Sequence, residues 1–412
     1  MPTVVTTGAA YSTNKGAASM VQSLLDNLPD HVEGVRFVEV STHPSGDRKA
    51  FAAAGIDVEV VSQTPKDIIL VQAPLAFVAG LLRSMRLPWR WALRNRTLRT
   101  IADADAVADI FGISFADDRR TAMNIYTALA AWVPMLLGTK VVKCAQAMGP
   151  FKKPVNRLLA KLTLPRLARI CPRGDLSEGF LRKLRLKNLT PAGDLAFTMR
   201  VPDATRTRMS ERLAAHGPGP YLTVSPSQVV ATHMERTDID YPKIMAEFID
   251  LVGERTGLRV VMIAHSALLN RGVSSLNDLP VCRQIAGLVS NQDNLIFFDD
   301  DLLPTELRAV IGESQALVAS RFHAMISALT ELVPPVVIGW SHKYAEVLAP
   351  FGIEDFALDY SELRDAGRIV TEVEKVLSER DALVARITDN LPEAQRRSTR
   401  NFEVLAHVLR AG

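Results

Sequence analysis

The chain has 412 residues, of which 48% are hydrophobic and 23% are charged. This composition excludes a disordered chain and leaves room for two globular domains. Lys and Arg number 48 against 45 Asp and Glu, so the net charge of +3 gives no indication of nucleic-acid binding. Three widely spaced cysteines form neither a disulfide framework nor a thiolate metal site, and they indicate a reducing cytoplasm.

The first half of the chain alternates short apolar runs with longer segments of helical periodicity, a pattern typical of βα units and a parallel sheet. It starts directly on an apolar run and shows no signal peptide. Its longest apolar stretch, 128–138, contains Pro134 and is too short to cross a bilayer. The predicted strands are residues 3–7, 35–40, 68–72, 106–111, 140–146 and 168–171.

A polar passage at 202–220 ends in Pro218-Gly219-Pro220, which predicts a linker between domains. A second series of strands follows at 221–224, 259–264, 295–298, 316–319 and 335–339. We therefore predict an α/β fold with two facing Rossmann-like parallel-sheet domains, at 1–201 and 221–369, and C-terminal helices at 370–412 that pack back across both. Ligands of such sheets bind at the carboxyl ends of the strands, so functional residues should follow strands.

The segment from Ser320 to His323 lies where an apolar strand ends and an amphipathic helix begins. Free backbone N–H groups at such a helix start favour an anion. Arg321 adds a planar, permanently charged fork, and His323 can exchange a proton near neutral pH. Taken alone, these two side chains could equally be a surface ion pair and a helix cap.

Several further blocks, taken in chain order, resemble the polysaccharide pyruvyl transferase family. The resemblance runs from about the first strand to Phe351, and the Arg-x-His segment is its most telling part. The blocks are Asn14-Lys15-Gly16, 112–118, Gln146 to Phe151, Arg173 with Ser177, 193–197, and 320–329 followed by Val333-Pro334 and 340–344.

The resemblance implies phosphoenolpyruvate as a co-substrate that donates its enolpyruvyl group, with no cofactor and no metal. It implies that Arg321 and His323 carry the catalysis, with His323 as the acid that protonates the methylene carbon. On the donor side we expect Arg173, Arg321, Phe322, Ser225, His265 and Lys343, with Arg173 facing Arg321 across the two domains. On the acceptor side we expect Asn14, Lys15, Gly16, Asp117, Asp118, Gln146 and Gly149.

Two other classes of protein fit the same pattern. GT-B nucleotide-sugar glycosyltransferases also have two facing α/β domains and a long C-terminal helix. They often grip ribose with an acidic residue in the second domain, whereas this chain has Arg321 and His323 at the corresponding turn. A non-catalytic sugar-binding scaffold is the third reading, and the intact Arg321–His323 pair argues against it.

Two basic stretches of the sequence concern where in the cell the protein acts. Residues 81–100 contain six arginines, no acid, and both Trp89 and Trp91, and residues 152–173 are also free of acids. Such segments are either ordinary core-facing helices with a solvated face or contacts with an anionic membrane. We expect a cytoplasmic enzyme with peripheral contact at the inner face of the membrane, acting on a glycan or lipid-linked sugar.

Overall fold

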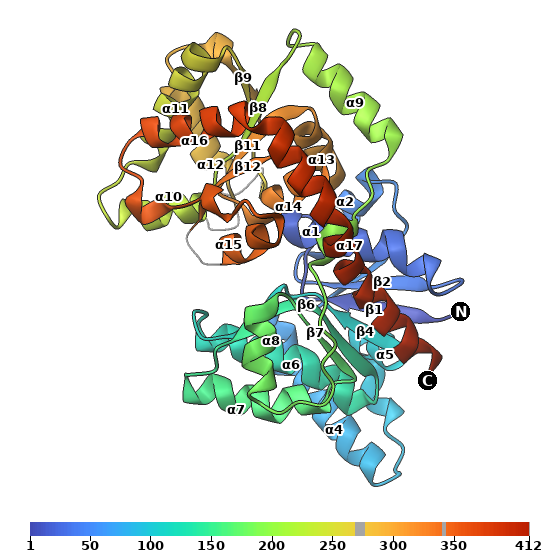
Figure 1. The fold of residues 1–412 in the computed structure, drawn as a ribbon. Helices are drawn as coiled ribbons and strands as arrows, with labels where there is room; N and C mark the ends of the chain where they lie inside the picture. Colours follow the sequence, from blue (N-terminus) through green and yellow to red (C-terminus); the bar gives the residue numbers. More distant parts are fainter. Residues whose placement is uncertain (268–276, 340–342, 412) are drawn as a thin grey trace. The chain divides into compact units, whose positions relative to one another are not determined.

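The structure is a computed structural model that describes residues 1–267, 277–339 and 343–411, without the side chains of Ala92 and Lys343. The chain forms two compact units. Unit 1 comprises Met1–Ser12, Met20–Met199 and Ala394–Gly412, and unit 2 comprises Thr13–Ser19 and Arg200–Glu393. Each unit is a parallel sheet with helices packed against it (Figure 1).

The sheet of unit 1 has the strand order β3-β2-β1-β4-β6-β5, with β7 paired to β6. All of its ladders are parallel, and Val5, Val107, Val141 and Ile170 from four of its strands lie in one apolar core. The strands are β1 Thr3–Thr7, β2 Arg36–Ser41, β3 Glu59–Ser62, β4 Ala106–Asp109, β5 Ile113–Ala116, β6 Lys140–Gly149 and β7 Arg169–Pro172.

The helices of unit 1 connect these strands, and α6 contacts both α4 and α7 in the layer drawn below the sheet in Figure 1. Helix α1 begins in the segment that belongs to unit 2. The helices are α1 Lys15–Asn27, α2 Pro44–Ala53, α3 Pro65–Asp67, α4 Ala73–Ser84, α5 Arg96–Ala102, α6 Thr121–Leu137, α7 Pro154–Thr163 and α8 Asp175–Arg182.

One predicted strand of this unit is wrong. Residues 68–72 form a turn of π-helix that joins α3 to α4, and the third strand is Glu59–Ser62 instead. A short apolar run does not distinguish a strand from a buried helix. Ile68, Gln72, Ala76 and Ala79 are buried at helical spacing, so the run continues as one face of a helix.

The sheet of unit 2 has the order β10-β9-β8-β11-β12-β13, and all of its ladders are parallel. The five predicted strands are present, and β13 was not predicted. The strands are β8 Tyr221–Ser225, β9 Arg259–Ile263, β10 Leu295–Phe298, β11 Ser314–Ala319, β12 Pro335–Gly339 and β13 Ala357–Asp359. The helices are α9 Asp203–Ala214, α10 Gln228–Glu235, α11 Tyr241–Thr256, α12 Leu279–Leu288, α13 Pro304–Gly312, α14 Phe322–Thr330, α15 Lys343–Leu348 and α16 Ala366–Ser378.

The passage at 202–220 differs from an extended linker. Helix α9 occupies most of it, and Met209 and Leu213 on α9 lie in the core of unit 2. Only two apolar positions four residues apart mark that buried face, which is why the sequence shows so little periodicity. At the C-terminus, α17 (Arg380–Arg410) contributes its first part to unit 2 and its second part to unit 1.

Candidate functional site

The polar residues of unit 2 gather where its strand order reverses. β8 is flanked by β9 on one side and β11 on the other, so the connections run outward in both directions from β8. Such a switch point leaves a crevice at the carboxyl ends of the strands. Ser225 ends β8, His265 follows β9, and Ser320 follows β11, with its backbone N–H donating to the Ser225 carbonyl at 2.9 Å.

Arg321 is held by a buried carboxylate, Asp278. The Arg321 Nε donates to Oδ2 of Asp278 at 2.7 Å, and a terminal nitrogen donates to Oδ1. Asp278 also accepts a hydrogen bond from the Gln228 backbone N–H at 2.9 Å. Burial lowers the pKa of Arg321, but the charge and hydrogen bonds of Asp278 raise it by more, so the net shift of the guanidinium pKa is upward. Burial raises the pKa of Asp278, and the neighbouring Arg321 reduces that rise. This two-point contact fixes the plane of the guanidinium.

His323 lies in the first turn of α14 and packs against Gly16. A Cβ on Gly16 would lie 2.7 Å from Cγ of His323 and closer still to Nδ1, so only glycine leaves room for this imidazole. The ring of Phe322 also packs against the imidazole in an edge-on arrangement, with 5.2 Å between the ring centroids. Packing against Gly16 and Phe322 therefore holds the imidazole in place.

The segment Thr13–Ser19 reaches this site from the start of the chain. The Ser266 hydroxyl donates to the Thr13 carbonyl at 3.0 Å, and Lys15 forms an ion pair with Asp301 at 2.6 Å. Asn14 caps α1, because its Oδ1 accepts from the Gly16 N–H at 3.0 Å. Asn14, Lys15 and Gly16 were expected on the acceptor side. Gly16 packs against His323, the expected acid, and Lys15 contributes to the electrostatic environment of His265, an expected donor-side residue. The acceptor-side role of the three residues stays a prediction.

Two buried polar side chains at this site have no hydrogen-bond partner within the described ranges. They are His265, through both ring nitrogens, and Ser225, through its hydroxyl. Burial lowers the pKa of His265 to about 3, with further contributions from Arg321, His323 and Lys15. The imidazole is consequently neutral at physiological pH, with one N–H to donate. Unsatisfied buried polar groups carry a cost that a bound polar ligand removes.

The candidate residues of unit 1 form a separate buried network. Lys143 contacts Asp109 at 2.5 Å, and the Gln146 side-chain amide donates to the Asp109 carbonyl at 2.7 Å and accepts from Ser114. Gln146 is fully buried and its side-chain amide is hydrogen-bonded within the protein, and its expected role on the acceptor side stays a prediction. Arg173 forms an ion pair with Asp194 at 2.8 Å.

The remaining acceptor-side candidates have structural explanations. Asp117 accepts from the Asn156 side chain at 2.7 Å and from the backbone N–H of Lys152, which fixes the start of α7. Asp118 is exposed. Gly149 has φ of +99°, and a Cβ there would lie 2.6 Å from the Phe180 ring, so the position requires glycine.

Part of the predicted lysine loop lies outside the described residues. This applies to 340–342 and to the side chain of Lys343, the residue at which α15 begins. Sequence reasoning missed Asp278 and Asp301. Asp301 could have been found, since it ends the acidic run that follows the predicted strand 295–298. Asp278 precedes a helix and looks like an ordinary capping residue.

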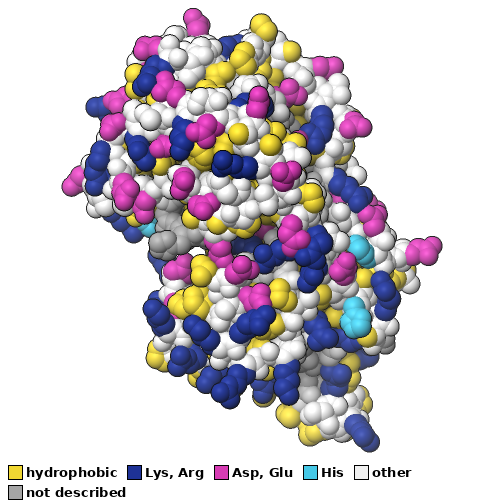
Figure 2. All heavy atoms as spheres, viewed as in Figure 1, with side chains coloured by type: hydrophobic (Ala, Val, Ile, Leu, Met, Phe, Trp, Pro, Cys, Tyr) yellow, Lys and Arg dark blue, Asp and Glu magenta, His cyan; other side chains and the backbone are white. Residues whose placement is uncertain are grey.

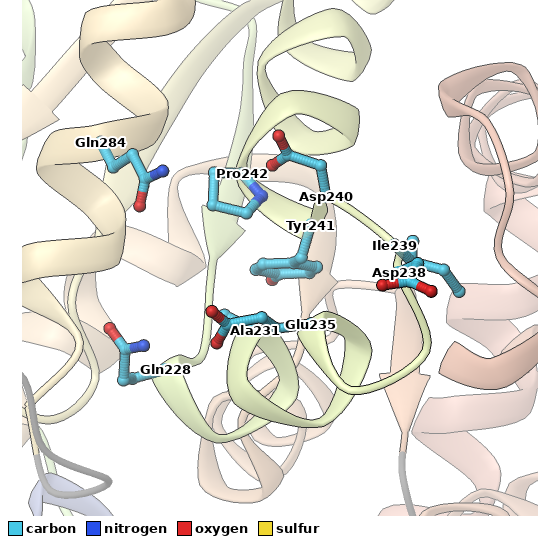
Figure 3. A pocket seen from close by; sticks show the side chains of 9 residues that line it. All are labelled: Gln228, Ala231, Glu235, Asp238, Ile239, Asp240, Tyr241, Pro242 and Gln284. Atoms are coloured by element: carbon cyan, nitrogen blue, oxygen red, sulfur yellow. The ribbon is translucent and has the colours of Figure 1, made fainter.

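A pocket of about 440 Å³ opens elsewhere in unit 2, around Tyr241 (Figure 3). Figure 3 shows Glu235, Asp238 and Asp240 among the residues that line it. The Tyr241 hydroxyl lies 2.9 Å from the Ser320 hydroxyl, which ties the wall of the pocket to the end of β11. Three carboxylates repel a phosphate-bearing ligand, so this pocket does not suit an anionic donor.

Comparisons with known proteins agree with this architecture. The UDP-GlcNAc 2-epimerase of Neisseria meningitidis bound to UDP-GlcNAc is 11% identical, with a TM-score of 0.61 over 98% of this chain and 99% of that one. The Staphylococcus aureus MnaA–UDP structure is 12% identical, with a TM-score of 0.58 over 95% and 91%. An Escherichia coli structure described as trehalose-6-phosphate bound with UDP-2-fluoro glucose is 11% identical, with a TM-score of 0.54 over 99% of this chain and 99% of that one.

These likenesses confirm the GT-B-like fold of two parallel-sheet domains, and at such identities they speak to the fold alone. The family comes from the sequence match. The model of the family described as polysaccharide pyruvyl transferase matches residues 14–342, which include the Asn14–Gly16 segment and the Arg321–His323 turn. The chain therefore belongs to the polysaccharide pyruvyl transferase family.

Proposed function

We propose that this transferase moves the enolpyruvyl group of phosphoenolpyruvate onto a pair of sugar hydroxyls as a ketal. The observation that carries the proposal is the buried site at the β8/β11 switch point. There, the unpartnered side chains of Ser225 and His265 lie with two cations, Arg321 and Lys15. Fixed positive charge together with buried unused donors is the arrangement that an anion requires.

The donor carries a phosphate and a carboxylate on one small framework, so its site needs two separate groups of donors. The guanidinium of Arg321 and the start of α14 supply one group. Lys15, the neutral His265 N–H and the Ser225 hydroxyl supply the other. Asp301 balances Lys15 in the absence of ligand, which lowers the cost of burying an ammonium group.

Ketal formation balances with the groups at hand. His323 gives a proton to the methylene carbon, which becomes a methyl group and leaves an electron-poor carbon at C2. One sugar hydroxyl attacks C2, the C–O bond to phosphate breaks, and the second hydroxyl attacks the same carbon. Of the two hydroxyl protons, one leaves with phosphate and the other returns to His323. The overall reaction needs no cofactor.

Arg173 stays a proposed donor contact, with Asp194 as the carboxylate that orients it. The acceptor is proposed to be a glycan or a lipid-linked sugar. A nucleotide-sugar transferase is the alternative, since the structural neighbours include proteins bound to UDP-sugars. The Arg321–His323 turn favours a small dianion over a nucleotide.

Isotope transfer tests the proposal. The enzyme would be incubated with phosphoenolpyruvate carrying carbon-13 at C2, together with a panel of oligosaccharides and glycolipids. We expect acid-labile label on one glycan, equimolar release of phosphate, and loss of both in His323→Ala. A glycan that accepts sugar from a UDP-sugar while the label stays in phosphoenolpyruvate would overturn the proposal.

A further inference from the structure

Unit 1 carries an unusually apolar surface. The large apolar side chains of residues 65–91 are exposed, among them Leu70 at 72%, Phe77 at 63% and Trp91 at 56%. Contiguous exposed apolar surface of this kind marks an interaction site in a folded protein. The others are Ile69, Val71, Val78, Leu81, Met85 and Leu87.

This segment is anchored on unit 1 by one stripe only. Pro65–Ser84 is long and apolar enough to cross a membrane by length and composition, with a mean hydropathy of 1.5. However, Ile68, Ala76 and Ala79 are buried in the core of unit 1, and Gln72 accepts a hydrogen bond from Gln63 at 2.8 Å. The helix therefore lies along the unit with its opposite face exposed, which is the geometry of an interfacial helix.

Basic side chains follow this apolar face directly. Arg83, Arg86, Arg90 and Arg94 are exposed, and Asp67 is the single acid between residues 65 and 102. Figure 2 shows hydrophobic and Lys or Arg atoms together at the projecting end of unit 1, where Figure 1 draws α4. Trp89 packs against the core, whereas Trp91 points into solvent. Apolar side chains flanked by arginine and tryptophan suit the headgroup region of a bilayer.

Helix α7 repeats the pattern at a second place on unit 1. Its Val155, Leu158 and Leu162 are exposed and alternate with basic side chains at helical spacing. Because α6 contacts both α4 and α7, the two amphipathic helices belong to one layer of the unit. The basic residues are Lys152, Lys153, Arg157, Lys161 and Arg166.

We propose that unit 1 docks on an anionic lipid bilayer through the docking face, defined as the exposed side chains of residues 65–94 and of α7. A second copy of this chain is the other candidate occupant, but a two-fold interface would bring together two copies of the same arginine-rich patch, which holds a single acid between residues 65 and 102. Anionic headgroups meet that charge with the opposite sign.

Vesicle flotation of the full chain tests this proposal. We expect wild type to float with phosphatidylglycerol-containing vesicles, and to float much less with phosphatidylcholine alone or at high salt. Arg86→Gln with Arg94→Gln should weaken binding about 25-fold, from about fivefold per arginine near the surface. Phe77→Ser should weaken it as well. The matched controls in unit 2, Arg236→Gln with Arg364→Gln and the exposed Leu288→Ser, should bind like wild type.

Three results would overturn the proposal. The first is wild type that fails to float at low salt, and the second is docking-face variants that float as well as wild type. The third is a light-scattering result in which wild type is a dimer and Phe77→Ser is a monomer. That result would mean that a second copy of the chain covers the docking face. None of these readouts depends on transferase activity.

Discussion

Gly16 leaves the space that the imidazole of His323 occupies, although 307 positions separate the two residues in the chain. Any side chain at position 16 must displace the ring or the start of α1. A general acid contributes about 10²–10⁴-fold to a rate only while it is aimed at the atom that it protonates.

We therefore expect Gly16→Ala to lower kcat by at least about tenfold through displacement of His323. The Michaelis constant for phosphoenolpyruvate should change little, since the cations stay in place. Steady-state kinetics measures both values. Gly287→Ala is the matched control, because nothing lies within 4 Å of a Cβ at that helical position. Wild-type kcat in Gly16→Ala would show that the position of His323 is immaterial.

Asp278 should act on donor binding through Arg321. Asp278→Asn keeps the shape of the residue but removes the charge that fixes the guanidinium. We expect the Michaelis constant for phosphoenolpyruvate to rise about tenfold while kcat changes much less. Breaking a buried ion pair should also reduce the free energy of unfolding by about 3 kcal/mol.

The control for this variant is Asp300→Asn, which removes the partner of the part-exposed Arg212. Such surface pairs contribute about 0–1 kcal/mol, so neither stability nor donor binding should change much. Arg321→Lys, which keeps the charge and loses the fork, should reproduce the kinetic effect of Asp278→Asn. A folded Asp278→Asn enzyme with a wild-type Michaelis constant would show that Asp278 does not orient Arg321 for donor binding.

We expect Lys15 to affect binding of the donor rather than binding of the acceptor. Its ammonium is buried, pairs with the more exposed Asp301, and contributes to the electrostatic environment of His265. We expect Lys15→Met to raise the Michaelis constant for phosphoenolpyruvate and to leave that for the glycan within about twofold. Lys243→Met, at an exposed lysine of unit 2, is the control. The reverse pattern, with only the glycan constant changed, would restore the acceptor-side assignment.

His265 should make stability dependent on pH. Its folded pKa of about 3 lies below the ordinary value of 6.5, so the unfolded state takes up a proton first as the pH falls. This contribution is complete above about pH 6.5 and is lost toward pH 3, with a slope of up to about 1.4 kcal/mol per pH unit. We expect His265→Gln to flatten the decline between pH 6.5 and 5.

Urea unfolding at each pH measures this slope for wild type and His265→Gln, with His233→Gln as a control at a part-exposed histidine of α10. Inorganic phosphate should stabilise wild type more than His265→Gln, because the anion uses the buried N–H. Parallel stability curves for the two proteins would mean that His265 is not buried in its neutral form.

The sequence predicted the alternation of strands and helices well, because buried parallel strands are short apolar runs bounded by polar turns. It also predicted the Arg321–His323 turn, since a strand end and a helix start can both be recognised locally. The run at 68–72 was misread because four consecutive apolar residues carry no period of their own. Only its helical continuation through Ala76 and Ala79 identifies it.

The partners of the site could not be predicted in the same way. The pairing of Arg321 with Asp278 spans 43 positions, and that of Lys15 with Asp301 spans 286. Asp278 looks like an ordinary capping residue, and the acidic run that Asp301 ends does not indicate which residue it pairs with. Asn14, Lys15 and Gly16 were expected on the acceptor side from their resemblance to the family's opening Asn-x-Gly loop. The sequence could not predict that Lys15 pairs with Asp301 and that Gly16 packs against His323.

Equilibrium binding can show whether the site takes phosphoenolpyruvate as its donor, and this measurement needs no knowledge of the acceptor. Thermal unfolding of the full chain would be followed with phosphoenolpyruvate, with UDP-N-acetylglucosamine, and with neither. We predict that phosphoenolpyruvate stabilises wild type, by about 2.7 kcal/mol when its concentration is 100 times the Kd, and stabilises Arg321→Ala far less. Stabilisation by the UDP-sugar, with none from phosphoenolpyruvate, would show that phosphoenolpyruvate is not the donor.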